Sequence, residues 1–115
     1  MSDHTPDHHA VVRLAELAGE LLDQARDHPS GRAARTIASS TSQRGTVIAL
    51  TEGTRLADHD APAAATLQVL TGRVRLHTAD HEWLLDNGEL LPMPPQRHGV
   101  DALADSVMLL TVALR

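Results

Sequence analysis

Residues 66–77 read Thr-Leu-Gln-Val-Leu-Thr-Gly-Arg-Val-Arg-Leu-His, and this stretch decides the fold. Two short runs flank a turn at Gly72. In the second run, Arg73–His77, polar and apolar residues alternate, so Val74 and Leu76 share one face, which we expect to point inward. A period of two residues around a glycine turn indicates two β-strands rather than a helix.

Similar short runs recur along the chain after Gly31, separated by turn residues such as those of Asp86-Asn87-Gly88. Many short strands at this spacing predict a β-sandwich or a β-barrel. The expected strands are Arg35–Ala38, Thr46–Leu50, Thr54–Asp58, Thr66–Leu70, Arg73–His77, Glu82–Leu85, Leu90–Met93, Gly99–Ala102 and Ser106–Leu114.

The N-terminal part follows a different pattern. Residues 1–9 are polar, and we expect a disordered tail. From Ala10 to His28 apolar residues recur at i, i+3, i+4 and i+7, which predicts a helix with one apolar face and Asp7 as its N-cap. That face must pack on the barrel wall or on a second subunit. The chain is thus expected to divide into the tail, a helical segment at 10–30 and a barrel at 31–115.

Composition excludes several classes of function. The 115 residues carry a net charge of −5, contain no cysteine, and include Trp83 as their single aromatic residue. Nucleic-acid binding needs clustered cations and often stacking aromatics, so we expect no nucleic-acid partner. Disulfides and cysteine nucleophiles are excluded. The polar N-terminus and the lack of a run of about eighteen apolar residues predict a cytoplasmic protein without a signal peptide or membrane span.

Two segments carry a resemblance to a known family. Gly53–Ala61 reads Gly-Thr-Arg-Leu-Ala-Asp-His-Asp-Ala and continues into the strand at 66–70, while Gly88–His98 reads Gly-Glu-Leu-Leu-Pro-Met-Pro-Pro-Gln-Arg-His. Together they resemble the two motifs of the cupins, and the chain is similar to a small bacterial, RmlC-like, single-domain cupin. The resemblance implies an all-β double-stranded β-helix, that is a jelly-roll barrel, here with one N-terminal helix, and a homodimer.

The cupin resemblance also implies a divalent metal at the barrel mouth. The family's ligands are two histidines separated by one residue, a glutamate, and a histidine of the second motif. His59 and His98 match the first and last of these, so they are the predicted metal ligands, whereas Ala61 and Ala65 stand at the other two positions. The ligand set is therefore degenerate. The expected cofactor is one Zn, Fe, Mn or Ni ion, or no metal.

Such ions usually require at least three protein ligands. The sequence shows two, and no third ligand is evident. In a regular strand the neighbours of His59 point to the opposite face unless a bulge intervenes, and His77 shares the outward face of Arg73 and Arg75. The weighed candidates are Asp58, Asp60, Gln68, His77 and His81.

Ligand binding is predicted at Arg97 and Gln68. Arg97 precedes His98 and would hold an anionic ligand, or else pair with Asp101 or Asp105. Gln68 follows Ala65 by three residues, an odd number, so strand alternation places its side chain on the opposite face, away from the family's metal centre.

The predicted function is binding of a small organic molecule, one divalent metal, or both, in the barrel mouth. The alternative is a metal-free structural or regulatory homodimer, because the strands at Thr46–Leu50 and Ser106–Leu114 are apolar enough to bury an interface. The sequence leaves open whether the protein is an enzyme.

Overall fold

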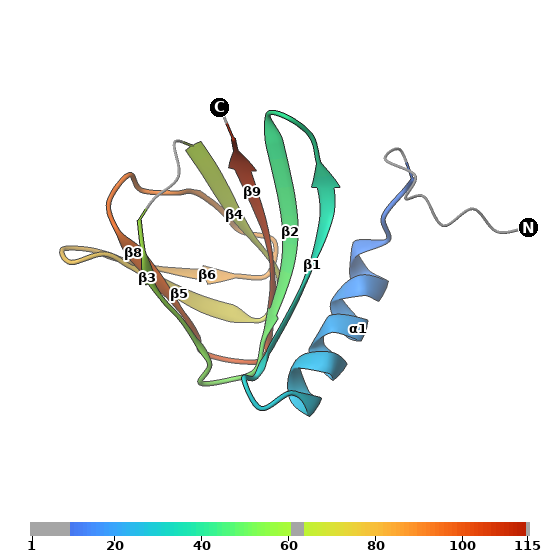
Figure 1. Ribbon diagram of the computed structural model, residues 1–115. Helices are drawn as coiled ribbons and strands as arrows, with labels where there is room; N and C mark the ends of the chain where they lie inside the picture. Colours follow the sequence, from blue (N-terminus) through green and yellow to red (C-terminus); the bar gives the residue numbers. More distant parts are fainter. Residues whose placement is uncertain (1–9, 61–63, 115) are drawn as a thin grey trace, which may run out of the picture.

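The computed structural model describes residues 10–60 and 64–114. Two antiparallel sheets face each other, and one helix lies on the outer side of the larger sheet (Figure 1). The strand orders are β1-β2-β9-β4-β7 and β3-β8-β5-β6. The strands are β1 (Arg32–Ser39), β2 (Gln43–Leu50), β3 (Arg55–His59), β4 (Ala64–Thr71), β5 (Arg73–His77), β6 (Glu82–Asp86), β7 (Leu90–Pro92), β8 (His98–Ala102) and β9 (Ser106–Ala113). The predicted all-β jelly roll with one helix is confirmed.

The first hairpin is longer than the sequence predicted. Strand β1 begins at Arg32 and β2 at Gln43, each three residues before its expected start. The turn is tightened by Ser40, whose hydroxyl accepts hydrogen bonds from the backbone N–H groups of Ser42 and Gln43. The hairpin end is polar and exposed, so it lacks the hydrophobic signal that marks the buried part of β2.

Helix α1 (Leu14–Asp27) is shorter than the predicted helix from Ala10 to His28. Its N-cap is Arg13, whose side chain makes no capping hydrogen bond. The predicted N-cap, Asp7, and the predicted tail at 1–9 lie outside the described residues. The prediction from apolar spacing alone therefore began the helix too early. Val11, which precedes α1, is exposed.

The apolar face of α1 packs on the outer face of the larger sheet. Leu21 and Ala25 are fully buried there, together with Val47 and Ala49 of β2 and Val107 of β9. Of the two partners considered for the helix, the barrel wall is the one observed. No helix in the described part of the chain is long and apolar enough to span a membrane.

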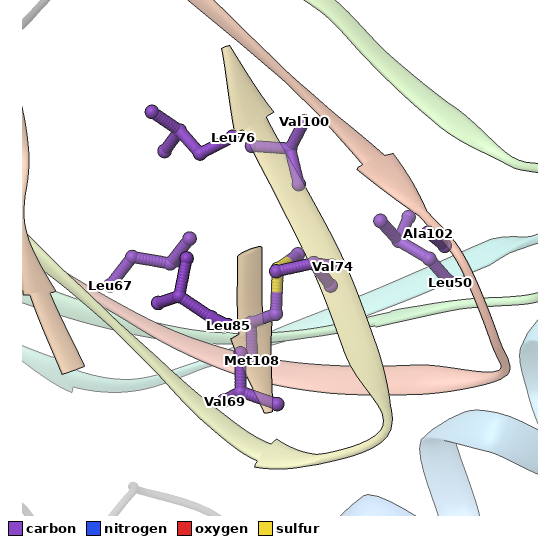
Figure 2. Packing of buried hydrophobic residues seen from close by; sticks show 9 residues of the cluster. All are labelled: Leu50, Leu67, Val69, Val74, Leu76, Leu85, Val100, Ala102 and Met108. Atoms are coloured by element: carbon purple, nitrogen blue, oxygen red, sulfur yellow. The ribbon is translucent and has the colours of Figure 1, made fainter. Parts of the chain in front are cut away.

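The hydrophobic cluster between the sheets consists of buried aliphatic side chains and Met108 (Figure 2). Strand alternation supplies it: in β5, Val74 and Leu76 point inward as predicted and are wholly buried, and Met108 of β9 faces them. Trp83 is half-buried against the same cluster. This packing fixes which face of every strand reaches the barrel mouth.

Candidate site at the barrel mouth

One end of the barrel gathers the two histidines predicted from the cupin motifs. The end of β3, the start of β4, the start of β8 and the end of β9 all meet at the upper end of the molecule in Figure 1. In the ladder between β3 and β8, His59 is the direct partner of His98. A bulge between Leu56 and His59 sets this register. The structure thus brings the backbones of both predicted ligands together; the side chain of His59 lies outside the described part.

His98 lies on the inner face of β8, two residues from Val100 and four from Ala102, which both belong to the core. Its side chain is wholly buried. Nδ1 lies 2.9 Å from the carbonyl oxygen of Gln96. A carbonyl can only accept, so Nδ1 carries a proton and donates it to this oxygen. This arrangement fixes the orientation of the imidazole.

A row of residues crosses the inner face of the larger sheet at the same end. Arg44 of β2 pairs with Val112 of β9, and Val112 pairs with Ala65 of β4. The N–H of Met93 donates to the carbonyl of Ala65 over 2.9 Å, which extends the row. Ala65, at the position of the family's glutamate, offers no side-chain donor, so this wall of the mouth is small and apolar except at Arg44.

The described residues do not fit a metal centre with three protein ligands. Within ranges 10–60 and 64–114, no group of three His, Asp or Glu side chains is arranged to hold an ion. Asp58 and His77 lie on the outer face beside Gly99, where an added Cβ would meet both of them. Asp60 forms an ion pair with Arg97. We therefore derive no chemical step through a metal.

The remaining predicted ligands lie elsewhere. His81 is exposed and stacks on Trp83, with ring centroids 5.8 Å apart. Gln68 is paired with Leu109, which packs on the helix side of the sheet. As parity predicted, the structure does not bring Gln68 together with His98, and a ligand at Gln68 would lie on the outer face.

Arg97 ties the ends of β3 and β8 together. It donates to the carbonyl of Asp58 over 2.9 Å and to the carboxylate of Asp60 over 3.3 Å. The alternative prediction, that Arg97 pairs with Asp101 or Asp105, is wrong. The bulge in β3 reverses the parity of the residues that follow it, and Asp101 and Asp105 pair with other arginines.

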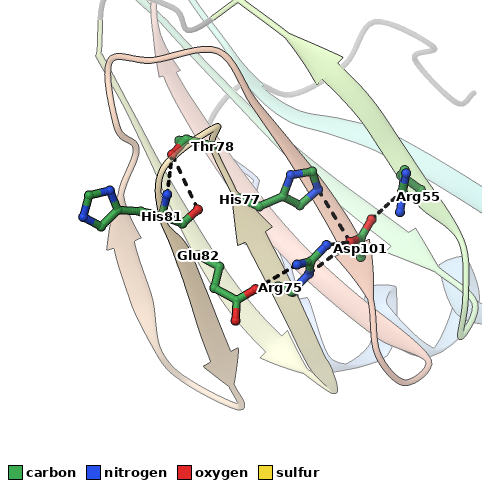
Figure 3. Close-up of polar contacts among 7 residues, drawn as sticks. All are labelled: Arg55, Arg75, His77, Thr78, His81, Glu82 and Asp101. Carbon is green, nitrogen blue, oxygen red and sulfur yellow. Dashed lines mark hydrogen bonds and ion pairs between the residues drawn. The ribbon is translucent and has the colours of Figure 1, made fainter.

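An ion-pair network covers the outer face of the smaller sheet (Figure 3). Asp101 accepts hydrogen bonds from Arg75 and Arg55, both at 2.7 Å, and Arg75 also donates to Glu82. His77 Nε2 lies 3.5 Å from the same carboxylate. Burial raises the pKa of Asp101, but the hydrogen bonds from the two arginines outweigh it and hold the pKa below its ordinary value.

The sequence analysis missed Arg44 as a residue of the inner face. Arg44 fell outside the predicted strand, which began at Thr46; continuing the alternation back from Ile48 would have placed Arg44 on the inner face. Trp83 pairs with Leu76 and is half-buried on the inner face of the smaller sheet.

No protein-family model matches the sequence, and neither does any curated protein. Solved structures do match. A conserved protein of unknown function from Streptococcus pyogenes superposes with a TM-score of 0.71 over 94% of this chain and 90% of its own, at 20% identity. An RmlC-like cupin from Desulfovibrio desulfuricans gives 0.66 over 96% and 97%, at 22% identity.

A variant of salicylate 1,2-dioxygenase from Pseudoaminobacter salicylatoxidans also matches, with a TM-score of 0.71 at 16% identity. The match covers 90% of this chain but 34% of the dioxygenase chain. At such identities a likeness speaks for the fold alone. Together with the observed jelly roll and the two motif segments, these matches show that the chain has the cupin fold.

Proposed function

We propose that this protein binds a small organic molecule at the barrel mouth, with His98 as the polar anchor. The observation that carries the proposal is the environment of His98. Its ring is wholly buried on the inner face, and its Nδ1–H donates to the carbonyl of Gln96, which holds the ring in one orientation. Small-molecule sites usually combine apolar walls with a few polar groups of fixed orientation.

The cupin neighbours support the same reading. One of them, salicylate 1,2-dioxygenase, takes a small aromatic acid as its substrate by name. In this chain Ala65 and Val112 line the opposite wall, and neither contributes a reactive group. Binding is thus the activity that the residues support, and we propose no catalytic reaction.

Binding can be tested with two probes of one shape, benzoate and benzamide, followed by amide chemical shifts of the full-length protein. We expect shifts at Ala65, Val112 and Val100 for at least one probe. His98→Ala should weaken the binding about tenfold or more, because an anchoring hydrogen bond is lost. His28→Ala is the matched control, since His28 is exposed and bonded to Ser30 at the far end of the barrel. Absence of shifts with both probes would overturn the proposal.

A second candidate function is binding of one divalent metal (Zn, Fe, Mn or Ni) by His59 and His98, with water or the bound molecule as further ligands. The register that pairs the two residues and the fixed orientation of the His98 ring favour it. Elemental analysis of the tag-free protein tests this candidate. A site at these two residues would bind about one ion per chain. The His59→Ala/His98→Ala double variant retains His4, His8 and His9, so equal metal content in both proteins would reject the site.

A further inference from the structure

Most arginines of this chain are already neutralised. The structure describes nine of them, and six form ion pairs with Asp or Glu: Arg26, Arg35, Arg55, Arg73, Arg75 and Arg97. Among the described residues the side chains of Arg13, Arg32 and Arg44 make no ion pair or hydrogen bond. In a chain with 15 acidic residues and a net charge of −5, a cation left without a carboxylate is a notable exception.

Of these three, Arg44 alone lies at the mouth. Strand β2 alternates between Val47 and Ala49 under the helix and Ile48 and Leu50 in the core. Arg44 has the parity of the second pair, so it lies on the inner face, and it is exposed at the hairpin end of the strand.

The other two free arginines lie elsewhere. Arg32 is paired with Leu50 and shares the inner face, but it begins β1 at the opposite end of the barrel. Arg13 is the N-cap of α1 on the outside of the molecule.

The residues beside Arg44 on the inner face carry no charge. Its neighbours along the row, Val112 and Ala65, are short, uncharged residues. No Asp or Glu of the described residues forms an ion pair with Arg44.

We propose that Arg44 recognises a carboxylate, and that the molecule bound at the mouth is a small organic acid. A guanidinium presents parallel N–H donors that match the two oxygens of a carboxylate, and such charge-assisted pairs are among the strongest hydrogen bonds. The apolar row beside Arg44 accepts the carbon body of the acid, while His98 lies at the same end of the barrel. This inference rests on the proposed function and names the class of its ligand.

The experiment compares benzoate with benzamide on four full-length proteins: wild type, Arg44→Gln, Arg32→Gln and His98→Ala. Amide chemical shifts and the fluorescence of Trp83, which is the only aromatic residue and faces the interior, report binding. Wild type should prefer benzoate by about tenfold or more. Arg44→Gln should lower benzoate affinity to that for benzamide and leave benzamide unchanged, while Arg32→Gln, a free arginine on the same face, should keep the preference.

The outcomes separate this inference from the proposed function. If both probes bind and His98→Ala weakens both, but Arg44→Gln keeps the preference for benzoate, the carboxylate assignment is overturned while small-molecule binding stands. If neither probe binds wild type, both proposals fail. Arg44 is exposed and makes no contact with an acidic residue of the described chain, so its variant should retain the melting temperature of wild type, which confirms that any change concerns binding.

Discussion

At the scale of single residues, Asp101 is the shared acceptor of the ion-pair network on the outer face of the smaller sheet. Its carboxylate joins Arg55 of β3 and Arg75 of β5 across β8, and only 14% of the side chain is exposed. By contrast, the pair of Arg73 with Asp86 links neighbouring strands at a fully solvated edge, with about half of each side chain exposed. Low exposure makes the first network worth more, because water screens it less.

We predict that Asp101→Asn destabilises the protein by about 1–3 kcal/mol at pH 7, because two guanidinium groups lose their shared acceptor. The pKa of Asp101 is lowered in the folded state. Its stabilising contribution is therefore present above the unfolded pKa, near 3.9, and lost as the pH falls through the folded value. Urea unfolding of both proteins from pH 7 to pH 2 measures this.

The difference between wild type and Asp101→Asn should shrink as the pH falls below about 4. Asp86→Asn is the control and should have a smaller effect at pH 7. A constant gap across the whole pH range would contradict the linkage.

Gly72 provides a second test at this scale. Its φ of 99° joins β4 to β5, and an added Cβ would clash with the backbone of Asp105 and Ser106. Gly88 also has a positive φ, 78°, but no atom lies within 4 Å of its added Cβ. In both alanine variants, backbone strain should lower the free energy of unfolding by about 1–2 kcal/mol. We expect a clearly larger loss for Gly72→Ala, because the clash adds to the strain. Thermal unfolding compares them, and equal losses would show that the close approach of the β8–β9 loop is irrelevant.

At the scale of elements, helix α1 is held by its packing rather than by its ends. It has no side-chain cap, and Gly19 sits in its middle. The buried Leu21 contacts the sheet, whereas Gln24 one turn on faces solvent. Tertiary contact, and not helix propensity, accounts for its stability.

We predict that Leu21→Ala costs about 2–5 kcal/mol, because it leaves a cavity between helix and sheet. Gln24→Ala should change the free energy of unfolding by less than about 0.5 kcal/mol. Chemical denaturation gives both values. If the two variants unfold alike, the helix is not docked in solution.

Gly19→Ala should stabilise the protein by about 0.5–1 kcal/mol. Gly19 is exposed, has no positive φ, and an added Cβ meets nothing within 4 Å. The alanine therefore reduces the entropy of the unfolded chain without creating a clash. A lower melting temperature than that of wild type would contradict this expectation.

At the scale of the whole molecule, α1 packs on strands that were predicted to be apolar enough for a dimer interface. The strands at Thr46–Leu50 and Ser106–Leu114 were expected to be apolar enough for a dimer interface. In the structure Val47 and Val107 of these strands are covered by the helix of the same chain. The part of these strands that the helix covers is therefore not open to a second chain.

The homodimer stays a prediction, drawn from the resemblance to small cupins. Light scattering should give twice the chain mass of 12.3 kDa for full-length protein. Leu21→Ala, which loosens the helix, should leave this value unchanged if the interface lies elsewhere. A mass of one chain at all concentrations would reject the dimer.

Much of the fold could be predicted from the sequence, whereas the site could be predicted only in part. Alternation placed Val74 and Leu76 inward, and the motif segments placed His59 and His98 at one end of one barrel. The sequence did not reveal the partners of Arg97, because a bulge in β3 reverses the parity of the residues after it. It also omitted Arg44, because a strand end exposed to water carries no hydrophobic period.

By itself, the sequence determined the class of fold, the turns and the buried face of each strand, since these depend on local alternation and on residue types. Only the tertiary structure decided which distant residues meet: the row from Arg44 to Ala65, the pairing of His59 with His98, and the docking of α1 on the sheet. The physical reason is register. Contacts between strands far apart in the chain depend on bulges and hairpin ends, whose positions are set by the packing of the whole barrel.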